Sequence, residues 1–334
     1  MRWALVGAST IASSYMIGAM RAQPGGQVVA ICSGNLARAS DFAVQNEIAG
    51  AYDDLPKMLA EAQSDAVYIS STNEKHYSQA LAAIAAGKHV LCEKPVALTR
   101  AEAEEMVDAA SAAGVVFGTN HHLRCSGAHR AMRELIAAGR VGKVLSLRIH
   151  HAVHLPSNLQ GWRINDAGAG GGVIPDITVH DADVVRFLLG EDPVSVVAQM
   201  GSSGMGEGVE DSAMSLWSMP GGAMVMSHES FTHPFAGTGL EVHGDKGSIF
   251  ARNVMTQEPV GQITLVREAG SEEISFSNHS LYHQSVSDFV AAIAGQGRPA
   301  ADGADGIKSL AVALAVRDAA ASGHRIDVDY GGAR

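Results

Sequence analysis

The ten residues WALVGASTIA, at positions 3–12, decide the fold class of this chain. An apolar run ends at Gly7, which suits a tight turn, and a segment of helical length follows at 10–22. A buried strand that passes through a glycine turn into a helix opens a dinucleotide-binding βαβ unit. The usual fingerprint is G-x-G-x-x-G, but here Ser9 and Ala12 stand at the second and third glycine positions. Ala12 is small enough for close helix–strand packing, and the Ser9 hydroxyl offers a hydrogen bond to a phosphate.

Strand-like and helix-like segments alternate through the first 120 residues. Predicted strands lie at 3–8, 27–33, 65–70, 89–94 and 115–120, and predicted helices lie at 10–22, 35–47, 76–87 and 99–114. Thr99 and Glu102 have the spacing of a capping box at the start of the last helix. This alternation predicts an α/β domain, a doubly wound parallel sheet of the Rossmann type.

After residue 120 the pattern changes. Helices are expected near 127–138, 175–189, 281–294 and 303–321, with a long strand at 143–155 and several strand-like runs within 194–277. The pattern predicts a C-terminal α+β domain with an open, mainly antiparallel sheet. The expected domains are therefore 1–120 for NADP binding and 121–334 for substrate binding.

Composition excludes several classes of protein. The chain has 334 residues, 46% of them hydrophobic, and 24 basic against 35 acidic residues give a net charge of −11. This charge argues against nucleic acid or an anionic membrane as a partner. The three cysteines form no CxxC spacing, the N-terminus does not read as a signal peptide, and no apolar run is long enough for a membrane span. A cytoplasmic protein that acts on a small molecule is expected.

The end of the second strand indicates which dinucleotide is bound. NAD enzymes usually carry an acidic residue there for the ribose, but this chain has Ser33, Gly34 and Asn35, with Arg38 in the following helix. A hydroxyl and a guanidinium suit a 2′-phosphate, because a charge-assisted hydrogen bond to it is strong. NADP(H) is therefore the expected cofactor, and the alternative is that Arg38 is a solvated helix residue.

Other residues at strand ends are candidates to line the cofactor crevice, since ligands bind at the carboxyl ends of parallel strands. The helix after the glycine turn offers free N–H groups from its first residues. The polar loop after the 65–70 strand is equally typical of an ordinary βα connection. The candidates are Thr10 and Ile11 at the helix start, Ser71, Thr72, Asn73 and His76 in the loop, and Glu93 and Lys94 after the next strand.

Five motifs together resemble the glucose–fructose oxidoreductase/inositol dehydrogenase/rhizopine catabolism (Gfo/Idh/MocA) family. They are GASTIA, STNEKH, CEKP, GTNHHLR and DITVHDAD. The resemblance implies a Rossmann domain followed by an open-faced α/β domain. It also implies that Lys94 lies in the active site, that Asp176 and His180 form the catalytic Asp-x-x-x-His pair, and that Asn120 follows the last Rossmann strand. The chain is most similar to the ketose reductases of the family, which implies NADPH-dependent reduction of the C2 ketone of 1,5-anhydro-D-fructose to 1,5-anhydro-D-mannitol.

The chemistry of these three residues fits a ketone reduction. Asp176 and His180 are four residues apart and so share one face of a helix. A histidine can donate a proton near neutral pH, and a lysine can stabilise the developing oxyanion or relay the proton. We expect His180 as the acid, Lys94 as the polarising group and Asp176 as a substrate anchor; His180 and Lys94 can also exchange roles.

Further substrate contacts are expected from Trp162 and Arg163, which can stack on a sugar and hydrogen-bond to it, and from Tyr282 and His283. Core packing is the alternative for Trp162. No metal is expected, because His150 and His151 are adjacent in a predicted strand and point to opposite faces.

Two other functions stay open. One is a sugar or inositol dehydrogenase that runs in the oxidative direction. The other is a non-catalytic, cofactor-sensing regulator on the same fold. The combination of Lys94, Asp176 and His180 favours the enzyme. An open sheet face is compatible with a monomer or a homodimer.

Overall fold

A computed structural model describes residues 1–332, and the chain divides into two compact units. The first contains Met1–His122 and Tyr282–Ile307, and the second contains Leu123–Leu281 and Lys308–Gly332. The segment Tyr282–Ile307, expected in the second domain, thus belongs to the first unit. It does so because its helix buries Tyr282, Val286 and Phe289 in the core of that unit.

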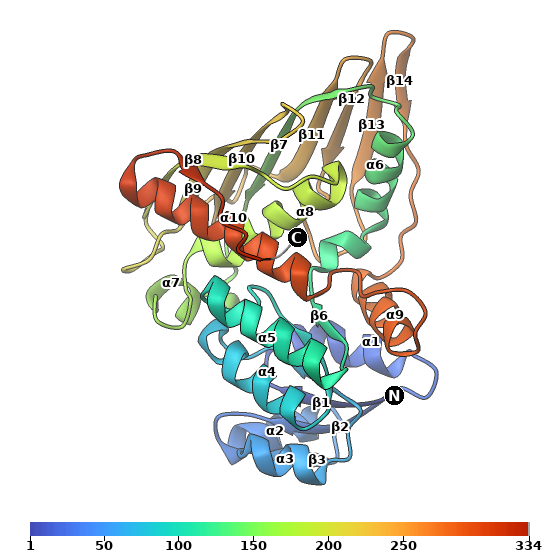
Figure 1. The fold of residues 1–334 in the computed structure, drawn as a ribbon, viewed down its shortest axis with the longest axis vertical. Coiled ribbons are helices and arrows are strands. Elements are labelled where there is room, and N and C mark those ends of the chain that lie inside the picture. Colours follow the sequence, from blue (N-terminus) through green and yellow to red (C-terminus); the bar gives the residue numbers. More distant parts are fainter. Residues whose placement is uncertain (333–334) are drawn as a thin grey trace. The chain divides into compact units, whose positions relative to one another are not determined.

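The first unit is built on a six-stranded parallel sheet (Figure 1). Its strand order is β3-β2-β1-β4-β5-β6, the Rossmann order that the alternating sequence predicts. The strands are β1 (Arg2–Val6), β2 (Gln27–Cys32), β3 (Gly50–Tyr52), β4 (Ala66–Ile69), β5 (His89–Cys92) and β6 (Phe117–Thr119). The prediction missed β3, since three residues are too few to show a period.

Helices cover both faces of this sheet. One apolar core, centred on Trp3, Leu5 and Tyr68, packs against residues of the π-helical turn η1 (Ala12–Met16), α1 (Ile17–Arg21), α2 (Leu36–Gln45) and α9 (Leu281–Ile293). The remaining helices are α3 (Leu55–Glu61), α4 (His76–Ala85) and α5 (Arg100–Ala113), which pack against one another in that order. The predicted capping box of α5 is confirmed, because Thr99 and Glu102 each bond the backbone of the other.

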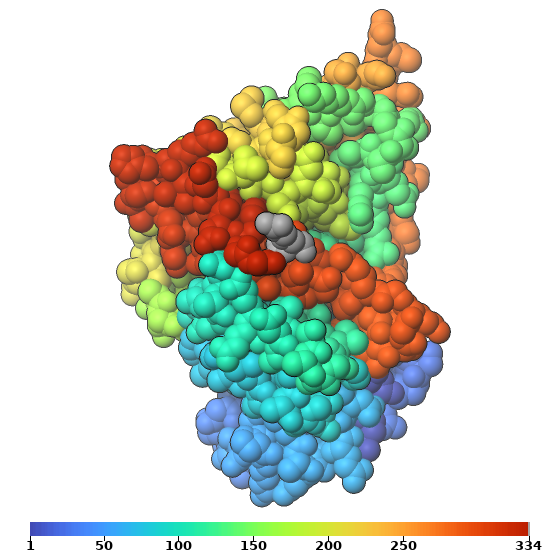
Figure 2. Space-filling view, in the orientation of Figure 1, coloured from blue at the N-terminus to red at the C-terminus, as the bar shows by residue number. Residues whose placement is uncertain are grey.

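The second unit contains a nine-stranded sheet of order β14-β13-β12-β11-β7-β10-β9-β8-β15. Among the described pairs, β7 and β10 run parallel and the others antiparallel, so the mainly antiparallel prediction is confirmed. The β13–β14 hairpin projects from one end of the unit (Figure 2). The strands are β7 (Val144–Ala152), β8 (Ser195–Gly201), β9 (Ser212–Ser218), β10 (Met224–Ser230), β11 (Thr238–Gly244), β12 (Ser248–Arg252), β13 (Gln262–Arg267), β14 (Gly270–Glu273) and β15 (Ile326–Asp327).

One face of this sheet is covered and the other is open. Helices α6 (Gly127–Ala137) and α8 (Val179–Leu189) pack on each other and on the sheet. The last helix of the chain is α10 (Gly303–Ser322). The opposite face exposes apolar side chains of β9 and β10, namely Met214, Leu216, Met224 and Met226. Shorter elements are η2 (Asn73–Lys75), η3 (His122–Cys125), η4 (Ser157–Leu159), α7 (Trp162–Asn165) and η5 (Ile174–Thr178). Within residues 1–332, every helix is too short or too polar to span a membrane.

Candidate functional site

The glycine turn has the tight geometry that dinucleotide binding requires. Gly7 has φ of +103°, and a Cβ there would lie 2.6 Å from the backbone nitrogen of Ser71. The hydroxyl of Ser9 lies 2.7 Å from that of Ser70 and accepts a 3.2 Å hydrogen bond from the N–H of Ala12. Ser9 therefore stands where the usual fingerprint has a glycine, and its hydroxyl links the turn to the loop after β4 and to the helix start.

The residues that follow β2 bring a cation to the same turn. The side chain of Asn35 caps α2 by accepting the N–H of Arg38 at 2.8 Å. The guanidinium of Arg38 donates from Nη2 to the carbonyl of Ala8 at 2.9 Å and stays exposed. With Ser33 and Gly34 between the strand and the cap, the segment 33–38 contains no carboxylate. The first unit thus has the parts of a dinucleotide site: a turn closed to any side chain, a helix start and an adjacent guanidinium.

The loop after β4 is anchored by a buried histidine. One ring nitrogen of His76 lies 2.8 Å from the carbonyl of Pro95 and the other 3.2 Å from the carbonyl of Ser71. Burial lowers the pKa of His76, and a neutral ring has a single N–H. The ring therefore donates to one of these carbonyls and packs against the other, between this loop and the turn that carries Lys94. Thr72 donates to Glu74, and Asn73 is buried. Of the four loop candidates, His76 thus supports the shape of this loop through its buried ring.

Glu93 fixes the end of β5 immediately before Lys94. Its Oε1 accepts from the hydroxyl of Tyr68 at 2.5 Å and from Nδ2 of Asn120 at 2.6 Å. Asn120 in turn accepts from Ser285 at 2.8 Å. Burial raises the pKa of Glu93, although its hydrogen bonds oppose the shift. The network makes the strand end rigid, so the backbone that presents Lys94 has little freedom.

Tyr282 and His283 begin α9 in the first unit. The ring of Tyr282 is 1% exposed and lies between Tyr15, at 4.6 Å between centroids, and His122, at 4.9 Å. Its ring therefore packs as a core side chain. His283 is exposed, and its carbonyl accepts a hydrogen bond from Gln23.

In the second unit, the structure brings together three of the four residues expected to meet the substrate. Nε of Arg163 lies 3.5 Å from Oδ2 of Asp176, and its guanidinium carbon lies 4.6 Å from the centre of the Trp162 ring. Asp176 lies on the π-helical turn η5 and His180 at the start of α8, which continues it. Such π-helical turns are frequent at functional sites.

Two acidic residues that sequence reasoning missed hold this arrangement in place. Oε1 of Glu210 accepts the N–H of Ile174, the first residue of η5, at 3.0 Å. Asp211 is fully buried and accepts four backbone N–H bonds from the loop 203–206. Glu207, which directly follows this loop, donates its N–H to the carbonyl of Ile164 in α7. The adjacent pair thus ties the start of η5 and the helix of Trp162 to β9.

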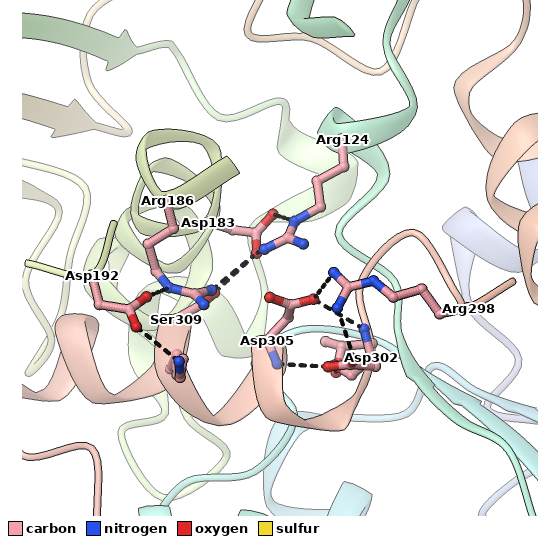
Figure 3. Close-up of polar contacts among 10 residues, drawn as sticks. Arg124, Asp183, Arg186, Asp192, Arg298, Asp302, Asp305 and Ser309 are labelled. Carbon is pink, nitrogen blue, oxygen red and sulfur yellow. Dashed lines mark hydrogen bonds and ion pairs between the residues drawn. The ribbon is translucent and has the colours of Figure 1, made fainter. Parts of the chain in front are cut away.

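Helix α8 is held by a buried ion network (Figure 3). Arg124 binds Asp183 with two hydrogen bonds, of 2.7 and 2.8 Å, and both side chains are at least 96% buried. Ser309 donates to the same carboxylate at 3.1 Å, and Arg186 pairs with Asp192 at 2.6 Å. The network joins η3, α8 and α10, so the helix that carries His180 is fixed from both sides.

Comparisons with known proteins agree with this architecture. Residues 1–121 match a family model described as "Oxidoreductase family, NAD-binding Rossmann fold", and residues 129–250 match the "GFO/IDH/MocA C-terminal domain". The chain belongs to the GFO/IDH/MocA oxidoreductase family. The resemblance seen in the sequence is therefore confirmed, as is the prediction of an enzyme that uses a nicotinamide dinucleotide.

Relatives and solved structures cover nearly the whole chain. A 1,5-anhydro-D-fructose reductase of Ensifer adhaerens is 51% identical over 99% of both chains. A myo-inositol 2-dehydrogenase of Thermotoga maritima is 28% identical over 80% of both. An aldose-aldose oxidoreductase of Caulobacter crescentus, solved with glycerol, has the same fold with a TM-score of 0.89 at 23% identity, covering 98% of this chain and 99% of that one.

In this member of the family, His180 has a second histidine beside it. The ring centroids of His180 and His151 are 6.5 Å apart, and Nδ1 of His151 lies 2.9 Å from Oδ1 of Asp181. Neither His151 nor Asp181 is identified from sequence as part of the site. The sequence holds one signal that could have found them. Glu229 is a carboxyl group at a buried position of β10, and it lies directly across from His151 in the parallel pair of β10 with β7. Among residues 1–332, no group of three or more metal-binding side chains is arranged to hold a metal ion.

Proposed function

We propose that this oxidoreductase reduces the C2 ketone of 1,5-anhydro-D-fructose to 1,5-anhydro-D-mannitol with NADPH. The observation that carries the proposal is the 51% identity over 99% of both chains to a protein named for that reduction. The residues expected to perform the chemistry, Lys94, Asp176 and His180, are all present. Three buried cysteines without a disulfide fit a reducing, cytoplasmic environment.

The residues divide the reaction between charge stabilisation and proton transfer. NADPH, when bound, supplies the hydride that adds to the ketone carbon. Lys94 stabilises the negative charge that develops on the ketone oxygen, because an ammonium favours the alkoxide over the neutral carbonyl. His180 donates the proton that completes the alcohol. Asp176, held by Arg163, accepts hydrogen bonds from sugar hydroxyls, and Trp162 offers a ring face to the sugar.

The cofactor site favours the 2′-phosphate. The guanidinium of Arg38 reaches the glycine turn, and the segment 33–38 carries no acidic side chain that would repel a phosphate. Ser33 adds a hydroxyl donor. Gly7, Thr10, Ile11 and Ala12 form the turn and helix start that receive the pyrophosphate.

Replacing Arg38 by Ala tests this cofactor assignment. A charge-assisted hydrogen bond contributes about 1.5–3 kcal/mol, so kcat/KM with NADPH should fall about 10- to 150-fold while kcat/KM with NADH changes little. Initial rates with both cofactors measure the ratio. Arg2→Ala, which removes an arginine outside the cofactor site, is the matched control. An unchanged NADPH/NADH preference in Arg38→Ala contradicts the assignment.

The proposed substrate is tested by turnover of the purified protein. With NADPH, 1,5-anhydro-D-fructose should be consumed faster than myo-inosose or D-glucose is with the same cofactor, and the product should be 1,5-anhydro-D-mannitol. Faster oxidation of inositol or a glucoside with NADP⁺ would make the protein a dehydrogenase instead. Tight NADPH binding without turnover of any of these sugars would support a cofactor-sensing regulator.

A further inference from the structure

A buried pair of carboxyl groups lies behind the proposed proton donor. Asp181 on α8 and Glu229 on β10 are both completely inaccessible to solvent, and their side chains contact each other. Oδ2 of Asp181 and Oε2 of Glu229 have no other hydrogen-bond partner. Two carboxylates repel each other, and two ionised groups in contact without water are very costly. A single proton between the two groups removes the repulsion and satisfies both oxygens.

The surroundings indicate which group holds the proton. Oδ1 of Asp181 lies 2.9 Å from Nδ1 of His151, and an ionised Asp181 is the stronger acceptor for that ring N–H. Glu229 accepts from Ser227 on Oε1, and its interaction with the charge of His151 is weaker than the effect of burial and of Asp181. Burial raises the pKa of both acids, and the contact with Asp181 raises that of Glu229 further. The proton therefore lies on Glu229, which donates it to an ionised Asp181.

We propose that Glu229 and Asp181 share one proton and hold His151 beside His180, so that all three act as positioning residues for the proton-transfer step. The proposal rests on the proposed reductase function for the role of His180. The contact of Nδ1 with Asp181 orients the ring of His151, whose centre lies 6.5 Å from that of His180. The negative charge of Asp181, acting through His151, is close enough to His180 to influence proton transfer there.

Other titratable groups also lie near His151. On β7 itself, burial lowers the pKa of the adjacent His150. On α6, burial lowers the pKa of His129 to about 4, so this neighbour is neutral at pH 7. On α8, Asp183 is neutralised by Arg124. On β11, the residue opposite His151 is the uncharged Thr238. The remaining acidic side chain on the adjoining element η5 is Asp176, which pairs with Arg163. The negative charge of Asp181 is therefore the one that His151 contacts directly.

The shared proton is tested without any substrate. A carboxyl group whose pKa is raised on folding binds a proton as the chain folds, so its contribution to stability is complete below the unfolded pKa and declines as the pH rises towards the folded pKa. Glu229→Gln keeps a donor for Asp181 but does not titrate. The difference in urea midpoint, Glu229→Gln minus wild type, should therefore increase steadily from pH 5 to pH 8. The exposed Glu134→Gln on α6 is the matched control and should show a constant difference. A constant difference for Glu229→Gln as well would mean that no proton is shared, and it overturns the proposal.

The role in proton transfer is tested by the pH dependence of catalysis. Asp181→Asn removes a negative charge beside His151, so the histidines lose their protons at lower pH. The alkaline limb of kcat/KM for ketone reduction should move down by about one pH unit or more. The exposed Asp318→Asn is the control and should keep the wild-type profile. If Asp181→Asn does not fold, His151→Gln is used instead, and it should alter the alkaline limb of kcat/KM. If the folded variant has the wild-type pH profile, the positioning role is overturned. The proposed function fails by a different result, namely that the wild-type protein itself does not reduce the ketone.

Discussion

Replacing His180 by Asn is expected to lower kcat for ketone reduction by about 10²- to 10⁴-fold, the usual contribution of a positioned general acid. Replacing Lys94 by Met should cause a loss of similar size, since it removes the cation that stabilises the alkoxide. Because both groups act mainly in the transition state, kcat and kcat/KM should fall together while KM changes little. Steady-state kinetics at saturating NADPH measure both constants.

The matched controls are the exposed side chains His324 and Lys57, replaced by Asn and Met. Both control variants should retain wild-type rates. The pH profiles of the two active-site variants also separate the roles of these residues. The variant that lacks the proton donor should lose the alkaline limb, and the variant that lacks the polarising group should keep it. Full kcat in either variant would contradict the mechanism.

The second large effect concerns stability rather than rate. Arg124→Met leaves the carboxylate of Asp183, which is 1% exposed, without its two-bond partner. Ser309 and Arg186 remain nearby, with Nη1 of Arg186 at 3.7 Å, but they replace neither of the two short bonds. Breaking a buried pair by removing one partner usually costs about 3–5 kcal/mol. Urea unfolding followed by circular dichroism should show a loss of this size in the free energy of unfolding.

A surface arginine provides the comparison for that loss. Arg317 pairs with Asp318, and both side chains are more than half exposed. Arg317→Met should change the free energy of unfolding by no more than about 0.5 kcal/mol, because exposed pairs contribute little. A loss below about 1 kcal/mol for Arg124→Met would mean that the network does not hold α8.

The fold follows closely from local pattern in the first unit and less closely in the second. WALVGASTIA specified β1, the turn and the helix start, since a buried parallel strand and a glycine turn are both encoded by adjacent residues. The parallel pairing of β7 with β10 has no such signal, because the paired residues, such as Ser146 and Met224, are 78 positions apart in sequence and meet only through the packed sheet. The return of Tyr282–Ile307 to the first unit also depends on long-range burial rather than on helical periodicity.

The candidate site also contains residues that the sequence predicts and residues that only the structure shows. Motifs predict Arg38, Lys94 and Asp176 as site residues, because their side-chain chemistry can be recognised along the chain. The pairing of Asp181 with Glu229 is invisible in sequence, since it joins a helix to a strand 48 residues later. Ser9 illustrates a smaller limit: its position was identified, but its hydroxyl bonds to Ser70 and the Ala12 N–H within the turn.

The central claim is hydride transfer to a ketone carbon, and isotope transfer tests it most directly. The protein is incubated with 1,5-anhydro-D-fructose and NADPH that carries deuterium at the transferred C4 position. Nuclear magnetic resonance of the product should show one deuterium at C2 of 1,5-anhydro-D-mannitol for each NADPH oxidised. Oxidation of NADPH without deuterium at C2, or no oxidation at all, would contradict the account.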